Sequence, residues 1–583
     1  MTVFAGAITL QDGQPLPEAL LNGLRRHVSR TAADHRLEMH GDGFFAVKVD
    51  IGAFGAPGMA RDKDGSVTAI AGEPLVRQGE HVHGWDRGND VDVLHPSLAA
   101  GDVRGLRSCR GTFCGLHFNP RLRSLTLFVD HSGVRPVYLW SGPRFAVFST
   151  ALRVLEALPE VPKQFDLAGV TEIAAFGLPL ADRTPYLAVS ALRAGELVRI
   201  EGGHVTRTFH SRWDGALDAG TPYLQTVANA HAAFMGAIAR RQRGKAAAAA
   251  FLSGGLDSRA IVGALKASGS TVHSVNYAPD GSQDQVFAAL IAKQLGVSHT
   301  QLETNAENVG QGYRKQAVSQ WLASTFKSEG QPPPAIWSGD GGSVALGHVY
   351  ITPKLNEAMR RGDTKAALAD FSAGVPLGII RRRMRATVAA LPLQGVQEEL
   401  AAISSPDGAR AFHLFLMMND QRRHLARHFE DIDLERIEFQ LPFFDADFLA
   451  SILRLPIEPM MFHHFYMDWL ARFPNGLDTT PWQSYPGHVP CPEASLHGLK
   501  YQWTGYYDKA MYAQMRRATI REGWRMLIDA GLPTQLLSRG ALLGAVTMTA
   551  CGIGDYSYLI KTASTFNRYW KLSTYTRTSS AIG

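Results

Sequence analysis

The chain has 583 residues, more than one hydrophobic core usually organises, so we expect two or more domains. Its 45% hydrophobic and 19% charged residues are typical of a soluble globular protein, and neither a signal-peptide pattern nor an apolar run of membrane-spanning length predicts a membrane partner. A net charge of +6, without a basic stripe interleaved with aromatics, predicts no nucleic-acid partner. Four scattered cysteines without CxxC spacing predict neither disulfides nor a thiolate metal site and favour a cytoplasmic location.

Residues 1–210 are predicted to be mainly β. Short apolar stretches such as 124–129 and 145–148 alternate there with turn clusters such as 130–133. Glycine, proline and aspartate collect in 211–222, which places the predicted boundary between domains 1–212 and 213–583.

Beyond this boundary, strands and helices are predicted to alternate. A helix opens at Tyr223, with Leu224, Val227, Phe234 and Ile238 on one face. Strands over 246–251 and 272–277 are each followed by a helix, the first from about Ser258 and the second over 283–295. This alternation predicts a parallel sheet with helices on both faces and a ligand beyond the carboxyl ends of its strands. Residues 355–480 are predicted to be mostly helical, and 481–500 to form an irregular loop.

The first of these turns is Phe251-Leu-Ser-Gly-Gly-Leu-Asp-Ser258, between a strand and a helix. Glycine backbone can approach a phosphate closely, and the helix N-terminus points free N–H groups at it. We expect Ser253, Gly254, Gly255 and Ser258 to cradle the pyrophosphate of ATP, and Asp257 to hold Mg²⁺. The alternative is an ordinary glycine turn, which the whole motif in this context does not favour.

Several further segments accompany this motif in order. In the C-terminal part, the motif itself, 282–299, Trp337-Ser-Gly-Asp-Gly-Gly-Ser-Val344 and Glu438-Phe-Gln-Leu-Pro-Phe-Phe-Asp445 resemble the ATP-pyrophosphatase domain of the asparagine synthetase B family. In the N-terminal part, 111–115, 128–138, 148–151 and 192–196 resemble the family's glutamine amidotransferase domain. The resemblance implies an α/β protein: an N-terminal Ntn-hydrolase-like α+β sandwich, then a doubly wound parallel sheet with helical additions.

The amidotransferase resemblance has two departures. The family's nucleophile is a processed N-terminal cysteine, and Ala5 stands where we place it; Thr2 is an alternative nucleophile three residues out of register. The family's Asn-Gly-Glu segment is also missing, and the nearest stretch is Ala71-Gly-Glu73. The resemblance therefore implies a degenerate glutaminase, so the amine must arrive on the substrate.

Two branches of the family share this loss, the β-lactam-type synthetases and the lasso peptide macrolactam synthetases. Segments 420–424, 428–430, 437–445 and 480–492 resemble the lasso branch. The resemblance implies ATP-dependent isopeptide closure in a leader-free core peptide, with that peptide and the pathway's leader peptidase as partners. The alternatives are an asparagine or β-lactam-type small-molecule synthetase, and a nucleotide-binding scaffold without catalysis.

The resemblance also assigns roles to individual residues. For Asp340 the roles of second Mg²⁺ ligand and general base compete with that of a loop-capping residue. The metal role is favoured because Ser343 and Val344 replace the family's next acidic pair. Glu438 would orient the base or the incoming amine, and Lys500, or failing it His488, would steady the adenylate. Adenine would lie against Leu252 and Val275, whose alternative is plain core packing, and the backbone of Ser338 and Gly339 would approach the nucleotide.

Three residues outside these assignments complete the expectations. Asp445 is predicted to be a structural helix cap. Arg422 and Arg423 would either bind phosphate or a peptide carboxylate, or form a salt bridge on a helix surface.

Overall fold

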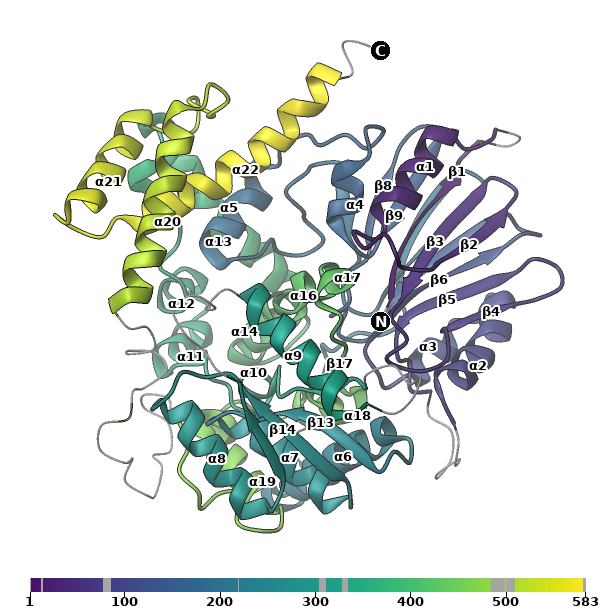
Figure 1. Cartoon of the computed structure of the whole chain (residues 1–583), viewed down its shortest axis with the longest axis vertical. Helices are drawn as coiled ribbons and strands as arrows, with labels where there is room; N and C mark the ends of the chain where they lie inside the picture. Colours follow the sequence, from purple (N-terminus) through teal and green to yellow (C-terminus); the bar gives the residue numbers. More distant parts are fainter. Residues whose placement is uncertain are drawn as a thin grey trace.

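The fold is taken from a computed structural model of the whole chain. The structure describes residues 2–11, 14–76, 85–215, 217–218, 220–302, 311–327, 334–483, 499 and 509–579. The elements form an N-terminal sandwich of two antiparallel sheets, a parallel sheet covered by helices, and a group of helices that joins them (Figure 1).

The sandwich consists of two six-stranded sheets. The first has the order β10 (Val189–Ala191), β8 (Tyr138–Ser141), β9 (Phe145–Ser149), β1 (Thr2–Thr9), β3 (Phe44–Asp50) and β2 (Arg36–Gly41). The second has the order β12 (His204–Phe209), β11 (Glu196–Glu201), β7 (Ser124–Val129), β6 (Phe113–Asn119), β5 (Val67–Gly72) and β4 (Met59–Arg61). β-Branched and aromatic residues, which pack well on a pleated surface, are frequent in β1, β3, β9 and β12.

Inward-facing side chains of the two sheets form one apolar layer between them. Phe4 and Phe44 of the first sheet meet Leu116 and Phe118 of the second, and the Phe44 and Phe118 rings stack with their centroids 4.2 Å apart. The helices of this region are α1 (Glu18–His27), α2 (Arg87–Ala99), α3 (Arg104–Ser108), α4 (Leu152–Ala157) and α5 (Leu167–Phe176).

The third sheet is parallel throughout. Its five strands follow the order β15 (Ser298–Gln301), β14 (Thr271–Asn276), β13 (Ala247–Phe251), β16 (Ile336–Trp337) and β17 (Phe439–Gln440). The central strand β13 is almost entirely alanine and is buried by its neighbours, so its position in the sheet outweighs its poor β propensity. The helices around it include α6 (Tyr223–Gln242), α7 (Leu256–Ala267), α8 (Gln283–Leu295), α9 (Gln311–Thr325), α10 (Gly342–Ala345), α18 (Ala446–Ile452) and α19 (His464–Leu470).

The remaining helices lie between the parallel sheet and the sandwich or beyond them. They are α11 (Pro353–Arg360), α12 (Thr364–Phe371), α13 (Arg385–Ala401), α14 (Gly408–Leu416), α15 (Arg422–His424), α16 (Ala426–Glu430), α17 (Ile432–Glu435), α20 (Lys509–Ile528), α21 (Arg539–Cys551) and α22 (Ser557–Ser579). Short helical turns η1–η5 cover Leu377–Ile379, Arg382–Met384, Met417–Gln421, Pro442–Phe444 and Glu458–His463.

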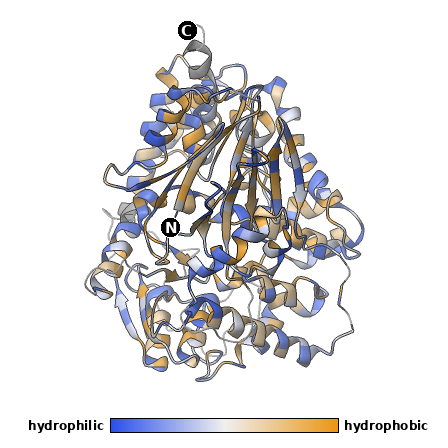
Figure 2. Ribbon diagram, turned by 90° about the vertical axis from the view of Figure 1, so that its right-hand side faces the viewer, coloured by the Kyte–Doolittle hydropathy of each residue, from blue (hydrophilic) through white to orange (hydrophobic). Residues whose placement is uncertain are grey.

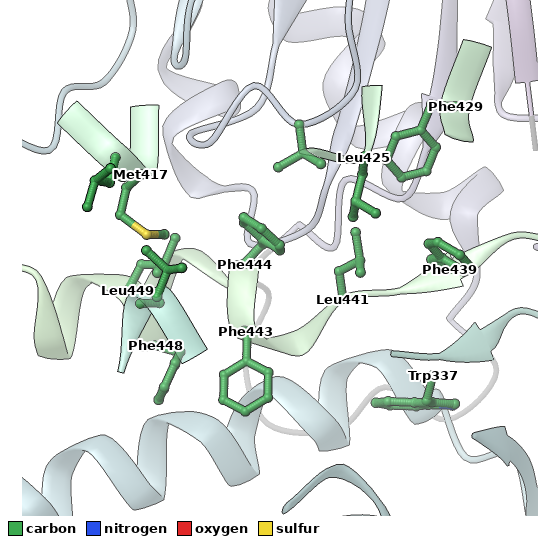
Figure 3. Packing of buried hydrophobic residues seen from close by; sticks show 14 of the residues in the cluster. Trp337, Met417, Leu425, Phe429, Phe439, Leu441, Phe443, Phe444, Phe448 and Leu449 are labelled. Atoms are coloured by element: carbon green, nitrogen blue, oxygen red, sulfur yellow. The ribbon is translucent and has the colours of Figure 1, made fainter. Parts of the chain in front are cut away.

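A single hydrophobic cluster extends across the predicted domain boundary. It includes Val3 and Tyr138 of the sandwich as well as Ile336 and Phe443 of the parallel-sheet region. Figure 3 shows part of it, where Phe443 and Phe444 of η4 lie between Phe448 and Leu441, with Trp337 nearby. The two regions therefore share a core.

The predicted fold class is confirmed: an α/β protein with an amidotransferase-like sandwich and a C-terminal parallel sheet. The predicted strand 124–129 and helix 283–295 coincide with β7 and α8. Of the four residues predicted on one face of α6, Val227, Phe234 and Ile238 are buried, whereas Leu224, in the first turn, is 70% exposed. The boundary at 212/213 lies between β12 and α6 and stays a prediction.

Hydrophobic and hydrophilic residues are mixed along the helices, as Figure 2 shows. Within the described parts of the chain, no helix combines the length and the apolar character needed to cross a membrane.

Candidate nucleotide-binding site

Two glycine-rich turns meet at the carboxyl edge of the parallel sheet. They follow β13 and β16, which are paired in parallel, so both turns emerge at the same edge. The contact is close enough to require glycine. A Cβ on Gly339 would lie 2.8 Å from the Asp257 Cβ, and one on Gly342 would lie 2.5 Å from Asp257 Oδ1.

The first turn, 253–258, is held by bonds among its own side chains. Ser253 N donates to Ser258 Oγ at 2.9 Å, and the two hydroxyls share a hydrogen bond of 2.8 Å. Gly255 is the N-cap of α7, which begins at Leu256. The first N–H groups of a helix have no intrahelical acceptor, and they carry the positive end of the helix dipole. The N–H groups at the start of α7 are therefore suited to bind an anion, whereas those of Ser253, Gly254 and Gly255 already donate to Ser258 Oγ, Asp284 Oδ1 and Ser253 Oγ.

Asp257 lies at the centre of this arrangement and is partly buried. Its Oδ1 accepts a hydrogen bond of 2.7 Å from the Tyr466 hydroxyl, and its Oδ2 accepts bonds from Ser343 N at 3.0 Å and Ser343 Oγ at 2.5 Å. Burial raises the pKa of Asp257 to about 6; the bonds from Ser343 and Tyr466 oppose this increase, and the nearby Asp340 charge adds to it. Ser343 replaces an expected acid, yet here it anchors the predicted metal ligand.

Asp340 lies in the second turn and is more accessible, with 29% of its side chain exposed. Its Oδ2 accepts a 2.5 Å hydrogen bond from Ser338 Oγ, and its Oδ1 lies 3.7 Å from His424 Nε2. Asp257 and Asp340 interact electrostatically across the two turns.

This pair of carboxylates fits Mg²⁺. The ion usually takes one or two protein carboxylates and completes its coordination with phosphate oxygens and water. Among the described residues no group of three or more metal-ligating side chains exists, so a site here would depend on the nucleotide for its remaining ligands.

The two residues predicted beside adenine are both core residues at strand ends. Leu252 and Val275 are 1% exposed, and Leu252 N donates to Val275 O at 3.0 Å. Ser338 is also buried, and its backbone N donates to Gln440 O of β17 at 3.0 Å. Their contact with nucleotide stays a prediction, as it does for Gly339.

Glu438 is not brought to the two glycine turns. It precedes β17, at the amino end of the strand, whereas the turns lie at the carboxyl edge of the sheet. Its carboxylate is buried and forms an ion pair with Arg135 of the sandwich at 2.5 Å. The structure therefore gives Glu438 a contact between the two regions, and its predicted role with the base or amine stays without geometric support.

The remaining predicted residues have different outcomes. Lys500 and its fallback His488 lie outside the described residues. The helix-cap role of Asp445 is confirmed, because it precedes α18 and accepts from Asp447 N and Phe448 N. The surface salt bridge considered for Arg422 is wrong: Arg422 is 2% exposed and donates to the backbone carbonyls of Leu192 and Ala181.

Three residues of the site were not singled out from the sequence. Tyr466 of α19 carried no motif signal, since it lies in an apolar helical run. Asp284 lies in the 282–299 segment, and its Oδ1 accepts from Gly254 N at 2.5 Å. Arg259 is fully buried and donates to carbonyls of the first turn and of residues 477–481.

Ala5, which we compare with the glutaminase cysteine, belongs to β1, and that comparison stays a prediction. Ala5 lies inside this strand, opposite Val47 on one side and Ser149 on the other, and its side chain is fully buried. Within the chain the first cysteine is Cys109, so β1 contains no thiol.

Glu73, the remnant of the expected glutamine-binding segment, is occupied by contacts with the other region. Its carboxylate forms an ion pair with Arg243 at 3.1 Å and accepts a hydrogen bond of 2.6 Å from the Gln440 side-chain amide. Both partners belong to the second predicted domain, so this end of β5 is closed by protein.

Two family models match parts of the chain. Residues 229–333, which contain the first glycine turn, match the model described as asparagine synthase. Residues 77–213 match the model described as glutamine amidotransferase domain. The chain is thus similar to asparagine synthetases in two successive regions, in the same order as expected from the motifs.

Among individual proteins, the chain is similar to carboxyethyl-arginine beta-lactam-synthase of Streptomyces clavuligerus, with 25% identity over 302 residues. The alignment covers 51% of this chain and 52% of that protein, so the chain spans about half the length of its relative.

Two solved structures also match. One is glutamine phosphoribosylpyrophosphate amidotransferase from B. subtilis complexed with ADP and GMP, at 10% identity, covering 57% of this chain and 89% of that one. The other is an allosteric regulatory enzyme of purine biosynthesis, at 12% identity, covering 58% and 68%. Both have a TM-score of 0.21, and nothing below depends on them.

Proposed function

We propose that the protein is an ATP-dependent, AMP-forming carbon–nitrogen ligase that joins an amine to a carboxylate of the same substrate molecule. The observation that carries the proposal is the meeting of the two glycine turns around Asp257, the first of which lies inside the region similar to asparagine synthase. A carboxylate does not condense with an amine unaided, because hydroxide is a poor leaving group. Transfer of AMP to the carboxylate, with release of pyrophosphate, gives an acyl-adenylate that an amine can attack.

The residues at the sheet edge suit these steps. N–H groups at the start of α7 and the hydroxyls of Ser253 and Ser258 would hold the pyrophosphate oxygens. Asp257 and Asp340 would hold Mg²⁺, which neutralises phosphate charge when bound. Asp340 is the more exposed carboxylate and therefore also the better candidate to accept a proton from the attacking ammonium.

The specific reaction we propose is closure of a macrolactam in a leader-free lasso peptide precursor, between the N-terminal amine and an Asp or Glu side chain. The support is the lasso-like sequence segments, of which 420–424, 428–430 and 437–445 are described, and the absence of a thiol in β1, which removes the family's source of ammonia. The leader peptidase of the same pathway would supply the substrate.

The second candidate is a β-lactam-type small-molecule synthetase. It is favoured by the 25% identity with carboxyethyl-arginine beta-lactam-synthase over 302 residues. Both candidates share the chemistry of intramolecular amide closure and differ in the size of the substrate.

One experiment separates the candidates. The protein is incubated with ATP, Mg²⁺ and a leader-free peptide, a small β-amino acid, or aspartate with glutamine, and AMP and product mass are measured. Peptide-dependent AMP and a product lighter by one water support the macrolactam reaction. AMP with the small β-amino acid alone supports the second candidate, and glutamate release from glutamine contradicts the absence of a glutaminase. Nucleotide binding without AMP under every condition indicates a scaffold.

A further inference from the structure

A cavity of about 600 Å³ lies between the sandwich and the helices that cover it. It is lined by residues of α4, α5, α16 and α22, which lie in the middle and upper part of Figure 1. The volume is within the ~300–1,000 Å³ typical of ligand sites. None of the residues assigned to the nucleotide site lines this cavity.

Arginines dominate the charge of the wall. Arg30 and Arg153 are paired with Asp433, but three others keep donor capacity. Arg423 Nε is buried without a hydrogen-bond partner among the described residues. Arg427, 87% exposed, has only a loose ion pair of 3.6 Å with Asp431. Arg568 lies over the Tyr569 ring, and the described part of the chain gives it no acidic partner.

Acidic groups are interleaved with these arginines. Glu430 is held by the Tyr138 hydroxyl at 2.6 Å and by Leu152 N at 3.3 Å, and Glu156 accepts from Tyr186 at 2.7 Å. A doubly charged phosphate would be repelled by these carboxylates, whereas a single carboxylate beside peptide amides would suit a wall of alternating donors and acceptors. Burial raises the pKa of Glu430 to about 7, which reduces the negative charge of the wall near neutral pH.

A residue that lines the cavity is adjacent in sequence to a residue near the nucleotide site. Arg423 lines the cavity, and its neighbour His424 lies 3.7 Å from Asp340. Residues 422–430 thus contribute to both places, Arg423 to the cavity and His424 to the surroundings of Asp340.

We propose that this cavity binds the free carboxyl terminus of a peptide substrate through Arg427 and Arg568, with Arg423 at its inner wall. The inference deepens the proposed function and rests on it, because it takes the substrate to be a peptide. The carboxylate that reacts lies at the glycine turns, and the carboxyl terminus lies here.

The test measures binding and turnover separately. A fluorescent peptide with a free α-amine, one internal aspartate and a free carboxyl terminus is compared with its C-terminal carboxamide. The native protein is expected to bind the acid at least about tenfold more tightly, the effect of one charge-assisted hydrogen bond. Arg427→Gln/Arg568→Gln should abolish this preference and raise the KM for the acid only, leaving the KM for ATP and the affinity for the amide unchanged. Arg382→Gln, an exposed arginine outside the cavity, is the matched control.

Failure of the inference and failure of the proposed function give different results. Equal affinity for acid and amide in the native protein, with peptide-dependent AMP formation intact, overturns the inference alone. Preference for the acid that depends on both arginines, without AMP formation, keeps the inference and overturns the peptide ligase. Displacement of the peptide by inorganic phosphate at lower concentrations than by acetate would identify a phosphate site and overturn the inference.

Discussion

Asp257 is a partly buried carboxylate between the two glycine turns, where we propose that Mg²⁺ binds. Its pKa is raised to about 6 from an ordinary value of 3.8, chiefly by burial. A carboxylate binds metal only when ionised, so the proton and Mg²⁺ compete for this side chain.

Nucleotide binding in the presence of Mg²⁺ should therefore weaken in acid. We expect the affinity for Mg²⁺ with a non-hydrolysable ATP analogue to fall about tenfold per pH unit below pH 6, measured by calorimetry between pH 5 and 8. Asp257→Asn should bind weakly at every pH without this slope. An unchanged slope in Asp257→Asn would contradict the assignment.

Tyr466→Phe provides a finer control. The hydroxyl donates to the ionised form of Asp257, so its removal should move the midpoint of the same profile upward by about one pH unit.

The raised pKa of Asp257 also affects folding, but there an increase in pH is unfavourable. Because the folded pKa is raised, the stability contributed by the protonated Asp257 is lost as pH rises from about 4 to about 6.

At the scale of elements, the contact between the two glycine turns positions Asp257. Gly342→Ala would place a methyl group 2.5 Å from Asp257 Oδ1, and the carboxylate must move. We expect kcat/KM for AMP formation to fall roughly 100-fold, since a displacement of about 1 Å has such an effect in active sites.

Gly540→Ala is the control for this substitution. Gly540 lies in α21 with nothing within 4 Å of an added Cβ, so the change should leave turnover as it is and stabilise the helix slightly. Equal turnover in the Gly342→Ala variant and the native protein would show that AMP formation does not depend on the close contact between the two turns.

The turns themselves could be predicted from sequence, because glycine, serine and aspartate at fixed spacing between a strand and a helix carry their own geometry. The order of strands brings 253–258 and 338–342 together, and this followed from the parallel sheet. Tyr466 and Arg259 could not be found in this way, since their contacts join segments about 200 residues apart without a local pattern.

Ala5 and Glu438 show a second limit. The comparison of Ala5 with the cysteine depends on a short similarity, and the strand pairings place Ala5 opposite Val47 and Ser149. Glu438 precedes a motif, yet its partner Arg135 belongs to the other region, and no spacing in a sequence records such a pairing.

For the whole molecule, the Arg135–Glu438 pair is one of several buried contacts between the two regions. Both side chains are at most 2% exposed, and the Arg135 guanidinium also lies 4.2 Å from the centroid of the Phe429 ring. Glu438→Gln or Arg135→Met leaves a buried charge without its partner. We expect either change to reduce the free energy of unfolding by about 3–5 kcal/mol, measured by urea denaturation.

The double variant Arg135→Met/Glu438→Leu removes both charges and should recover most of that loss. Native-like stability in both single variants would show that the pair is not a significant link between the regions. The same variants keep Asp257 and both glycine turns, so AMP formation per folded molecule should change less than stability does.

The contacts of Glu73 with Arg243 and Gln440, at the end of β5, affect how such a chain can evolve. Deletion of the sandwich would uncover the buried face of β17 and the Arg243 guanidinium. Selection for the reaction proposed at the glycine turns is then enough to retain the sandwich, which persists as part of its neighbour's interior.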